Sequence, residues 1–197
     1  MPRVVAVVLT GGRSRRMGQD KAWVEVGGRP CVERVWAACA EACDTVEFQG
    51  ALAGLAAAFP GTPVWPDPAP GSGPLAGLRA ALERRPGQGV LLVACDMPFV
   101  SATLLRGVAA ALPGADWAAP AHAERLHPLS GAYAPAVLPV VQALLAAGRR
   151  SMHALLEEQS LTGRQVSPSP AWGDAERLLL NLNSPEDVAR ARGLAGG

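Results

Sequence analysis

Short apolar runs, several of them rich in valine, alternate along the chain with alanine-rich stretches that have helical periodicity. This alternation is typical of βαβ units, in which a helix crosses between two parallel strands. The sequence therefore predicts an α/β fold with a mostly parallel sheet. The predicted strands span residues 3–9, 45–49, 62–65, 89–95, 116–120, 130–134 and 178–182. The predicted helices span residues 30–43, 51–58, 75–84, 101–111, 136–147, 151–158 and 184–193.

The length and the charge of the chain exclude several classes of protein. Its 197 residues fit a single domain, residues 1–197, and its formal net charge is +1 with both signs interspersed. We therefore expect neither a nucleic-acid-binding surface nor a surface for anionic membranes. No apolar run approaches the roughly 20 residues of a membrane span, and the N-terminal run lacks the cleavage pattern of a signal peptide. We expect a cytoplasmic protein with no membrane or nucleic-acid partner.

The cysteines are too few and wrongly spaced for a disulfide framework or a zinc site. They are Cys31, Cys39, Cys43 and Cys95. Two of them lie four residues apart in an alanine-rich helical stretch, which favours small packing residues over a metal or redox function.

A glycine- and arginine-rich segment, residues 9–21, follows directly after the first predicted strand. It reads L-T-G-G-R-S-R-R-M-G-Q-D-K. Its glycines, which permit positive φ and a close approach of the backbone, are Gly11, Gly12 and Gly18. Its cations, which suit phosphate oxygens together with the N–H groups of such a turn, are Arg13, Arg15, Arg16 and Lys21. The segment is neither a Walker A loop nor a dinucleotide-binding G-x-G-x-x-G, so we expect a phosphate site of another kind, with an ordinary solvated loop as the alternative.

Lysine occurs only once in the chain. Of the 18 basic residues, 17 are arginine, and Lys21 is the exception. An ammonium is a compact point charge, whereas a guanidinium is a planar fork. Lys21 therefore indicates a position that needs a compact cation, with chance placement as the alternative.

Two aspartates follow predicted strands. Asp96, in C-D-M-P, comes directly after the apolar strand 89–95. A carboxylate beside a polyphosphate site is what a magnesium ion needs, and a helix-cap or turn aspartate is the alternative. Asp67 lies between two prolines and is equally compatible with a turn. The three histidines, His127 among them, show no partner in the sequence and are left out of the catalytic set.

The last predicted helix has the clearest start, with Ser184 as N-cap, a proline after it and two acidic residues in the first turn. Asn181 and Asn183 are therefore expected at the end of the preceding strand. Because ligands collect at the carboxyl ends of parallel strands, we expect these amides, the two aspartates and the glycine-rich segment to converge.

Four motifs occur in order along the chain: the segment 9–21, P-G-S-G-P-L-A-G-L (70–78), C-D-M-P (95–98) and N-L-N-S-P-E-D (181–187). With them the chain resembles the molybdenum cofactor guanylyltransferases over nearly its whole length. The resemblance implies a Rossmann-like three-layer αβα sandwich, the nucleotide-diphospho-sugar transferase fold, with a nucleotide-binding N-terminal part and an acceptor-binding C-terminal part. It implies transfer of GMP from GTP to molybdenum-molybdopterin with Mg²⁺, and release of pyrophosphate. It also suggests molybdoenzymes or other cofactor-biosynthesis proteins as partners.

The resemblance assigns functions to the matching positions. The implied catalytic residues are Lys21, Arg16 and Asp96, of which Asp96 would hold the metal. The implied GTP-binding residues are Leu9, Thr10, Gly11, Gly12, Gly18, Lys21, Gln49, Asp67 and Asp96. The implied acceptor-binding residues are Gly73, Gly77, Asn181 and Asn183. The sequence departs from the family at Thr10, where alanine is usual, and at Gln49, where a nucleotide-contacting asparagine is usual. Because glutamine is one methylene longer, a contact of Gln49 with the nucleotide stays open.

In the implied reaction, a phosphate oxygen of the acceptor attacks the α-phosphorus in line with the departing pyrophosphate, so catalysis consists of positioning and charge neutralisation. Three alternatives stay open: a CTP-dependent molybdopterin cytidylyltransferase, a sugar-phosphate nucleotidyltransferase and a non-catalytic GTP-binding module. Arg149 and Arg150 precede a predicted helix and are compatible with binding the pterin phosphate or with a solvated loop.

Overall fold

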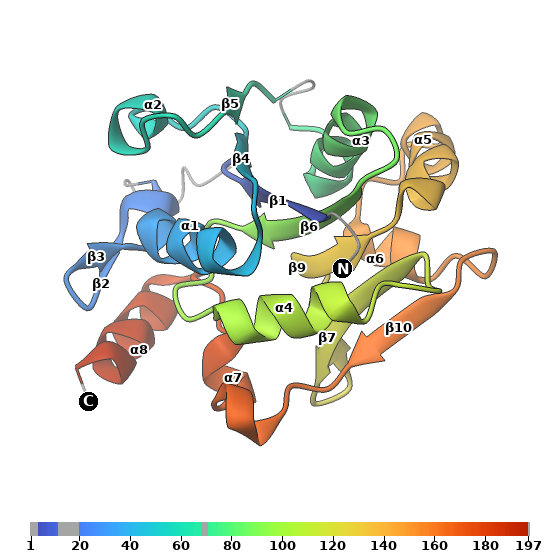
Figure 1. Cartoon of the computed structure of the whole chain (residues 1–197). Coiled ribbons are helices and arrows are strands. Elements are labelled where there is room, and N and C mark those ends of the chain that lie inside the picture. Colours follow the sequence, from blue (N-terminus) through green and yellow to red (C-terminus); the bar gives the residue numbers. More distant parts are fainter. Residues whose placement is uncertain (1–3, 12–19, 68–70, 197) are drawn as a thin grey trace.

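A central sheet organises the computed structural model, which describes residues 4–11, 20–67 and 71–196 (Figure 1). The strands lie in the order β10-β7-β9-β6-β1-β4-β5, and β8 pairs with the end of β7. They are β1 (Val4–Leu9), β4 (Val46–Gln49), β5 (Val64–Trp65), β6 (Gly89–Ala94), β7 (Trp117–His122), β8 (Arg125–Leu126), β9 (Ser130–Tyr133) and β10 (Gly163–Val166). A separate hairpin consists of β2 (Glu25–Val26) and β3 (Arg29–Pro30).

Most neighbouring strands of the sheet run parallel. β1 pairs in parallel with both β4 and β6, β4 with β5, and β10 with β7. β9 is antiparallel to its two neighbours, β6 and β7. The predicted mostly parallel sheet is therefore confirmed, and the carboxyl ends of β1, β4, β5 and β6 lie along one edge.

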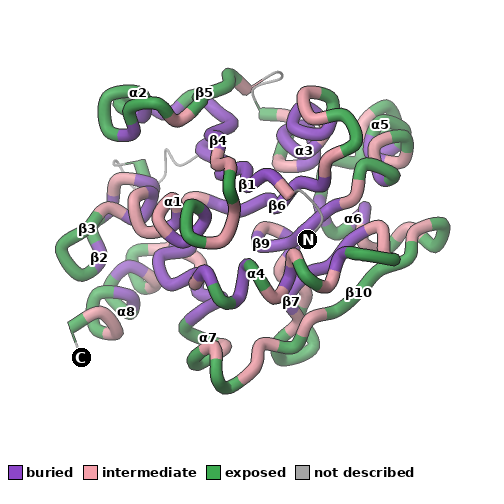
Figure 2. Tube along the Cα trace, viewed as in Figure 1, coloured by how far each residue is buried: buried purple, intermediate pink, exposed green. Residues whose placement is uncertain are grey.

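Alternate side chains of β1 enter two separate cores, as the pleat of a strand requires. Val5 and Val7 belong to one core, whereas Ala6 and Val8 belong to the other. All six residues of β6 are buried (Figure 2). A sheet that is buried on both faces needs a layer of helices on each of them.

Helices cover both faces of the sheet (Figure 1). Side chains of three helices fill the core around Val5 and Val7: α3 (Pro74–Arg84), α5 (Leu138–Ala146) and α6 (Met152–Leu156). Side chains of five others fill the opposite core: α1 (Cys31–Ala42), α2 (Leu55–Ala58), α4 (Ala102–Ala110), α7 (Ala175–Leu178) and α8 (Pro185–Ala195). The described residues also form three 3-10 turns: η2 (Lys21–Trp23), η3 (Pro135–Val137) and η4 (Pro170–Trp172). The three-layer αβα sandwich is confirmed.

The helix start predicted at Ser184 is confirmed as a capping box. The Ser184 hydroxyl accepts the Asp187 N–H at 3.2 Å, and the Asp187 carboxylate accepts the Ser184 N–H at 2.8 Å. Ser101 caps α4 in the same way by accepting the Leu104 N–H at 3.2 Å. These caps satisfy donors that a helix leaves unpaired at its start.

The predicted strand 178–182 is wrong. Its first residue ends helix α7, and the following residues cross the carboxyl edge of the sheet without strand pairing. The four leucines of this run are buried in the core that contains Ala6 and Val8. A short apolar run does not distinguish a strand from a buried irregular segment. Asn181 and Asn183 therefore lie in a loop that leads into α8.

Sequence reasoning missed β10 and the β2-β3 hairpin. β10 lies at the edge of the sheet, and its first three residues are exposed, so it has no alternating apolar pattern. The hairpin turns at Gly27 and Gly28, whose φ angles are 58° and 71°, as a tight two-residue turn requires. Within the described residues, no helix is long and apolar enough to cross a membrane.

We expect Gly163→Ala to lower the free energy of unfolding by about 1–3 kcal/mol, because overpacking a filled site has that cost. An added Cβ at Gly163 would overlap the indole ring of Trp117, which is only 6% exposed. The matched control is Gly193→Ala on α8, where an added Cβ meets no atom within 4 Å. The control should raise the free energy of unfolding by about 0.5–1 kcal/mol through helix propensity. Urea unfolding measures both, and equal effects would contradict the packing argument.

Candidate active site

Two adjoining cavities open at the carboxyl edge of the sheet, where β1 ends. Each has a volume of about 230 Å³, and both are lined by Leu9, Gly11 and Pro74. The first, here called the lysine cavity, is completed by Thr10, Asp20, Lys21, Ala94, Cys95, Asp96 and Leu129. The second, here called the glycine cavity, is completed by Gln49, Asp67, Gly71, Gly73 and Gly77. Residues from distant parts of the sequence thus form one cleft.

The end of β1 is held from both sides. The Leu9 carbonyl accepts the Cys95 N–H at 3.1 Å, and the Thr10 N–H donates to the Gln49 carbonyl at 2.9 Å. The Thr10 hydroxyl also points to the Gln49 carbonyl, at 3.4 Å, and Thr10 is 6% exposed. The backbone that enters the cleft is therefore fixed by β6 on one side and β4 on the other.

Two glycines allow the close packing around this strand end. Gly77 lets α3 approach β1, since an added Cβ would lie 2.7 Å from Leu9 Cδ2. Gly50 follows β4 with a φ of 138°, and an added Cβ would lie 2.6 Å from the Gly11 nitrogen. Sequence reasoning missed Gly50, although a glycine directly after a strand is a signal for such a close approach.

Lys21 and Asp96 are far apart in the sequence but line the same cavity. Asp20 caps the 3-10 turn η2, which begins with Lys21, by accepting the Ala22 N–H at 3.2 Å. Asp96 is partly buried after β6. Burial raises the pKa of the Asp96 carboxyl above its usual value, although the nearby Lys21 ammonium acts to lower it. A desolvated carboxylate and a compact cation therefore share one small space.

Asn183 joins this pair from the C-terminal part of the chain. Its Oδ1 accepts a hydrogen bond from Lys21 Nζ at 3.5 Å. Its own N–H donates to the carboxylate of Asp187 at 2.9 Å, so the capping box of α8 fixes its backbone. Burial opposes ionisation of Asp187, but these N–H donors and the Ser184 hydroxyl keep its pKa below the usual value.

The residue before Asn183 contacts the backbone of Asp96: the Leu182 N–H donates to the Asp96 carbonyl at 2.9 Å. The loop that was expected as a strand thus crosses directly over the aspartate.

The donor set at the cleft suits a metal that takes few protein ligands. No group of three or more His, Cys, Asp or Glu side chains gathers in a ligand arrangement among the described residues. All four cysteines are free, and burial raises the pKa of the Cys43 thiol to about 11 and those of the others as well. Protonated thiols are poor ligands. The Asp96 carboxylate offers hard oxygen donors, the type that suits an ion such as magnesium, because that ion takes one or two carboxylates and substrate oxygens.

A third cavity of about 300 Å³, here called the histidine cavity, contains Asn181 and Asn183. His122, Arg125, His127 and Arg190 also line it. The Asn181 Oδ1 is buried and has no hydrogen-bond partner among the described residues. Burial, with Arg125 nearby, lowers the pKa of His127 to about 4, so its imidazole is neutral at pH 7. Sequence reasoning missed these histidines because their neighbours come from other elements.

The remaining predicted residues are divided between the cavities. Asp67 lies against Gly11, where an added Cβ would be 3.4 Å from Asp67 Oδ2. Gly73, which has a φ of 78°, packs against the backbone of Arg150. It lines the glycine cavity with Gly77, whereas Asn181 and Asn183 line the histidine cavity. The structure thus does not bring the four implied acceptor residues into one cavity.

The other predicted residues are not among the described residues that line these three cavities. Gly12, Arg16 and Gly18, together with Arg13 and Arg15, lie outside the described residues. Arg149 forms an ion pair with Glu158 at 2.6 Å and is exposed on the surface.

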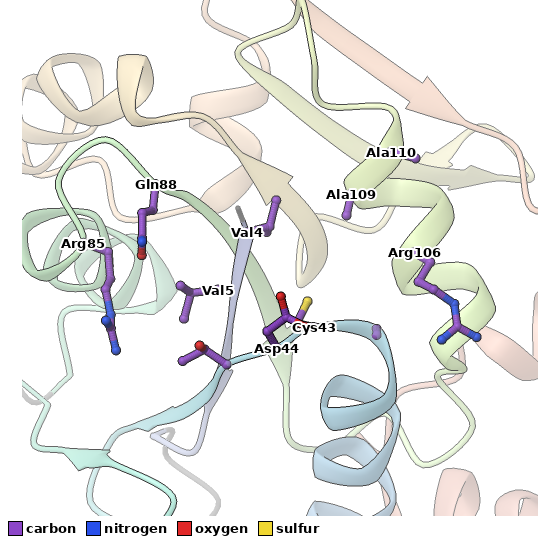
Figure 3. A pocket seen from close by; sticks show the side chains of 11 residues that line it. Val4, Val5, Cys43, Asp44, Arg85, Gln88, Arg106, Ala109 and Ala110 are labelled. Atoms are coloured by element: carbon purple, nitrogen blue, oxygen red, sulfur yellow. The ribbon is translucent and has the colours of Figure 1, made fainter. Parts of the chain in front are cut away.

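A larger cavity of about 390 Å³ lies at the opposite end of β1, where Val4 and Val5 line it (Figure 3). Its polar side chains include Asp44, Arg85 and Arg106. Arg106 is already paired with Glu41 at 3.0 Å. This cavity lies at the amino end of the strand, away from the edge where parallel sheets bind ligands.

The chain is similar to proteins of one known family. Residues 6–163 match the family described as the MobA-like NTP transferase domain. The probable molybdenum cofactor guanylyltransferase of Pelotomaculum thermopropionicum is 33% identical, over 99% of this chain and 95% of that protein. The molybdenum cofactor guanylyltransferase of Rhodobacter capsulatus is 36% identical, over 96% of this chain and 95% of that protein. This chain belongs to the molybdenum cofactor guanylyltransferase family.

The family is one of nucleotidyltransferases, so this member is an enzyme of that class. Solved structures confirm the fold. The molybdopterin-guanine dinucleotide biosynthesis protein A of Archaeoglobus fulgidus has a TM-score of 0.80 at 24% identity, covering 97% of this chain and 98% of that one. A cytidylyltransferase of Thermus thermophilus has a TM-score of 0.70 at 20% identity and covers all of both chains. Nucleotidyltransferases generally use a divalent metal, and a Mycobacterium tuberculosis neighbour (TM-score 0.75, 21% identity, 97% and 98% covered) was solved with manganese.

We expect Asp96→Asn to raise the melting temperature in metal-free buffer at pH 7. A carboxyl whose pKa is higher in the folded state than the unfolded value of about 3.9 costs stability once the pH lies above both values. The cost disappears when the pH falls below about 3.9, so the advantage of the variant should shrink towards that pH. Calorimetry with a chelator present measures the difference, and Asp44→Asn, at an exposed site, is the control. A lower melting temperature for Asp96→Asn at pH 7 would refute the argument.

Proposed function

We propose that this protein transfers GMP from GTP to molybdenum-molybdopterin, which forms molybdopterin guanine dinucleotide and pyrophosphate. The observation that carries the proposal is the meeting of Lys21, Asp96 and Asn183 at one edge of the sheet. Lys21 and Asp96 line the lysine cavity, and Asn183, 3.5 Å from Lys21 Nζ, lines the histidine cavity. A nucleotide on one side and an acceptor on the other would therefore meet at the lysine.

The proposed place of the nucleotide is the cleft of the lysine and glycine cavities. Leu9, Thr10 and Gly11 would contact the guanine and ribose, with Gln49 and Asp67 on the glycine side. The phosphates would lie toward Lys21, with Gly12, Arg16 and Gly18 contributing from the segment outside the described residues. Pro74 begins the 11-residue helix α3 and lines both cavities. The partial positive charge of this helix start favours phosphate binding.

Asp96 is the proposed ligand of Mg²⁺. Asp20 faces the same cavity, but its Oδ1 is engaged by the Ala22 N–H. A bound cation would offset the desolvation that raises the pKa of Asp96. When bound, the ion supplies positive charge to the phosphate oxygens of the nucleotide.

The proposed place of the acceptor is the histidine cavity. The unpartnered Oδ1 of Asn181 can accept a hydrogen bond from an N–H group of the pterin ring. Arg125 would provide a cation for its phosphate in the same cavity, where Arg190 forms an ion pair with Glu176 at 2.6 Å. Gly73 and Gly77 would shape the adjoining cleft. In this arrangement the N-terminal part of the single domain binds the nucleotide and the C-terminal part binds the acceptor.

The reaction needs no covalent intermediate with the protein. An oxygen of the acceptor phosphate forms a bond to the α-phosphorus of GTP while the bond from that phosphorus to the pyrophosphate oxygen breaks. Negative charge moves onto the pyrophosphate during this step. Lys21, and Arg16 by resemblance, would neutralise that charge, which is the main way in which such sites accelerate phosphoryl transfer.

The decisive experiment is pyrophosphate release with molybdenum-molybdopterin and either GTP, ATP or CTP. We expect GTP to be preferred by at least about tenfold in kcat/KM, because a site that reads a base by hydrogen bonds rejects bases with other edges. Preference for CTP would favour a molybdopterin cytidylyltransferase. Binding of GTP without pyrophosphate release would favour the non-catalytic module, and turnover with a sugar phosphate alone would favour a sugar-phosphate nucleotidyltransferase.

We expect Lys21→Met to lower kcat by about 10²–10³-fold, the usual effect of losing one electrostatic donor in a transition state. The rate of pyrophosphate release from GTP measures this loss. A fall of less than about tenfold would contradict the proposed contact of Lys21 with the phosphates.

The single lysine allows a control on the unmodified protein. Amine acetylation can modify only Lys21 and the N-terminus, and mass spectrometry separates the two sites. GTP with Mg²⁺ at ten times its Kd should slow acetylation of Lys21 about tenfold by occupying the site. The N-terminal amine should react at an unchanged rate in the same sample.

A further inference from the structure

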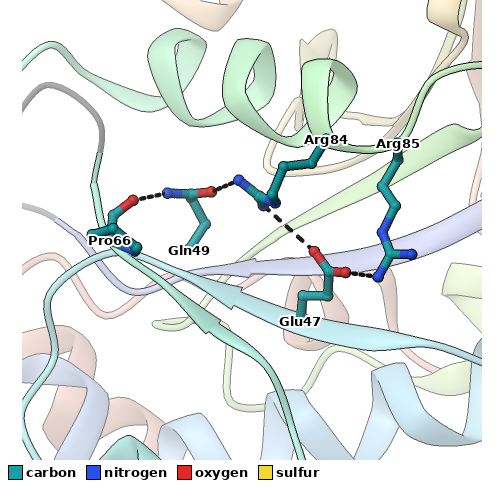
Figure 4. Close-up of polar contacts among 5 residues, drawn as sticks. All are labelled: Glu47, Gln49, Pro66, Arg84 and Arg85. Carbon is teal, nitrogen blue, oxygen red and sulfur yellow. Dashed lines mark hydrogen bonds and ion pairs between the residues drawn. The ribbon is translucent and has the colours of Figure 1, made fainter.

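Glu47 is a fully buried carboxylate on β4, with 0% of its side chain exposed. Two consecutive arginines at the end of α3 neutralise it (Figure 4). Arg85 Nη2 pairs with Glu47 Oε1, and Arg84 Nη2 lies 3.4 Å from Glu47 Oε2. A buried carboxylate requires such partners, because an unpaired charge in the interior has a large desolvation cost. Both guanidinium groups are therefore anchored to the sheet at one point.

Arg84 makes two further contacts. Its Nη1 donates to Gln49 Oε1 at 2.6 Å, and its guanidinium carbon lies 4.9 Å from the centroid of the Trp65 ring. Glu47 and Gln49 are two residues apart on β4, so their side chains share one face of the strand. Arg84 thus connects the buried charge on β4 to Gln49 and to β5.

Gln49 also contacts the segment that contains Asp67. Its Nε2 donates to the carbonyl of Pro66, directly before Asp67 (Figure 4). Because a guanidinium only donates hydrogen bonds, the amide oxygen of Gln49 must face Arg84, which turns the amide nitrogen towards Pro66. The orientation of the amide is therefore set by Arg84.

Asp67 follows a short strand at the edge of the sheet. β5 is a two-residue edge strand whose residues Val64 and Trp65 are 36% and 38% exposed. Its carbonyl at Trp65 accepts the Gly50 N–H at 2.9 Å, after which the strand ends. The Gln49 side chain donates a hydrogen bond to the backbone carbonyl directly before Asp67, and the Asp67 carboxylate lies against Gly11 in the glycine cavity.

We propose that Arg84 is a positioning residue for the nucleotide, and that it acts through Gln49 and the Pro66 carbonyl to place the Asp67 carboxylate in the glycine cavity. The inference rests on the proposed function, in which Asp67 contacts the bound nucleotide. Arg84 itself is not among the described residues that line the lysine or glycine cavity. Its effect on the nucleotide therefore passes through the two hydrogen bonds of Gln49.

The matched pair of variants is Arg84→Met and Arg85→Met. Each removes one guanidinium from Glu47, but only Arg84→Met removes the partner of Gln49. We expect Arg84→Met to raise KM for GTP about tenfold, since a hydrogen bond from a charged donor is lost, and to leave kcat within about twofold. Arg85→Met should leave both constants near their wild-type values. Thermal unfolding records the loss of stability that both variants share.

Three outcomes would overturn the inference: unchanged KM in Arg84→Met, an equal rise of KM in both variants, or a fall of kcat as large as the rise of KM. If Arg84→Met does not fold, Arg84→Lys replaces it, because one ammonium cannot contact both Glu47 and Gln49 as the guanidinium does.

Calorimetric titration with GTP distinguishes a failure of this inference from a failure of the proposed function. Wild-type protein that binds no GTP would refute the proposed function and this inference with it, whereas wild-type binding with unchanged Kd in Arg84→Met would refute the inference alone.

Discussion

The parallel pairing of β1 with both β4 and β6 is the constraint on which the site depends. It brings three strand ends to one edge, so the residues that follow them must share the space above that edge. Leu9 and Thr10 are then held by hydrogen bonds to the backbones of Cys95 and Gln49. Gly77 leaves room for α3 to pack on β1, and Gly50 leaves room for the backbone of Thr10 and Gly11 beside β4. The cleft therefore results from the parallel pairing of these strands, and the glycines allow the surrounding elements to pack closely.

The chemistry of the cleft has a cost in stability. A carboxylate after an apolar strand loses hydration, and the structure compensates Asp96 only in part with the charge of Lys21. A site that is fully neutralised by its own protein would have little affinity for a cation or for phosphate. Glu47 shows the contrast, because two arginines neutralise it and it serves the structure. Glu47 on β4 and Asp96 directly after β6 are therefore neutralised to different degrees because their partners differ.

Much of this arrangement could be predicted from the sequence, and the limits have physical causes. Alternating apolar and helical runs predict the parallel sheet and its covering helices, because both patterns are local. The motif around Ser184 predicts the start of α8 for the same reason. The strand predicted at 178–182 is wrong, because leucines fill a core equally well in a strand or in a loop. The histidine cavity and the contact between Arg84 and Gln49 depend on which elements meet in space, which no local pattern in one sequence records.

At position 49, the additional methylene of glutamine changes which groups the side chain can contact. An asparagine there would end about 1.5 Å closer to the strand, which would separate its amide from Arg84 or from the Pro66 carbonyl. Gln49 reaches both groups, and both its oxygen and one of its N–H groups are then engaged. One N–H and one lone pair of the oxygen are left for any direct contact with a ligand. We expect Gln49 to contribute to nucleotide binding by holding Asp67 more than by touching the base, because Arg84 and the Pro66 carbonyl fix the orientation of its amide.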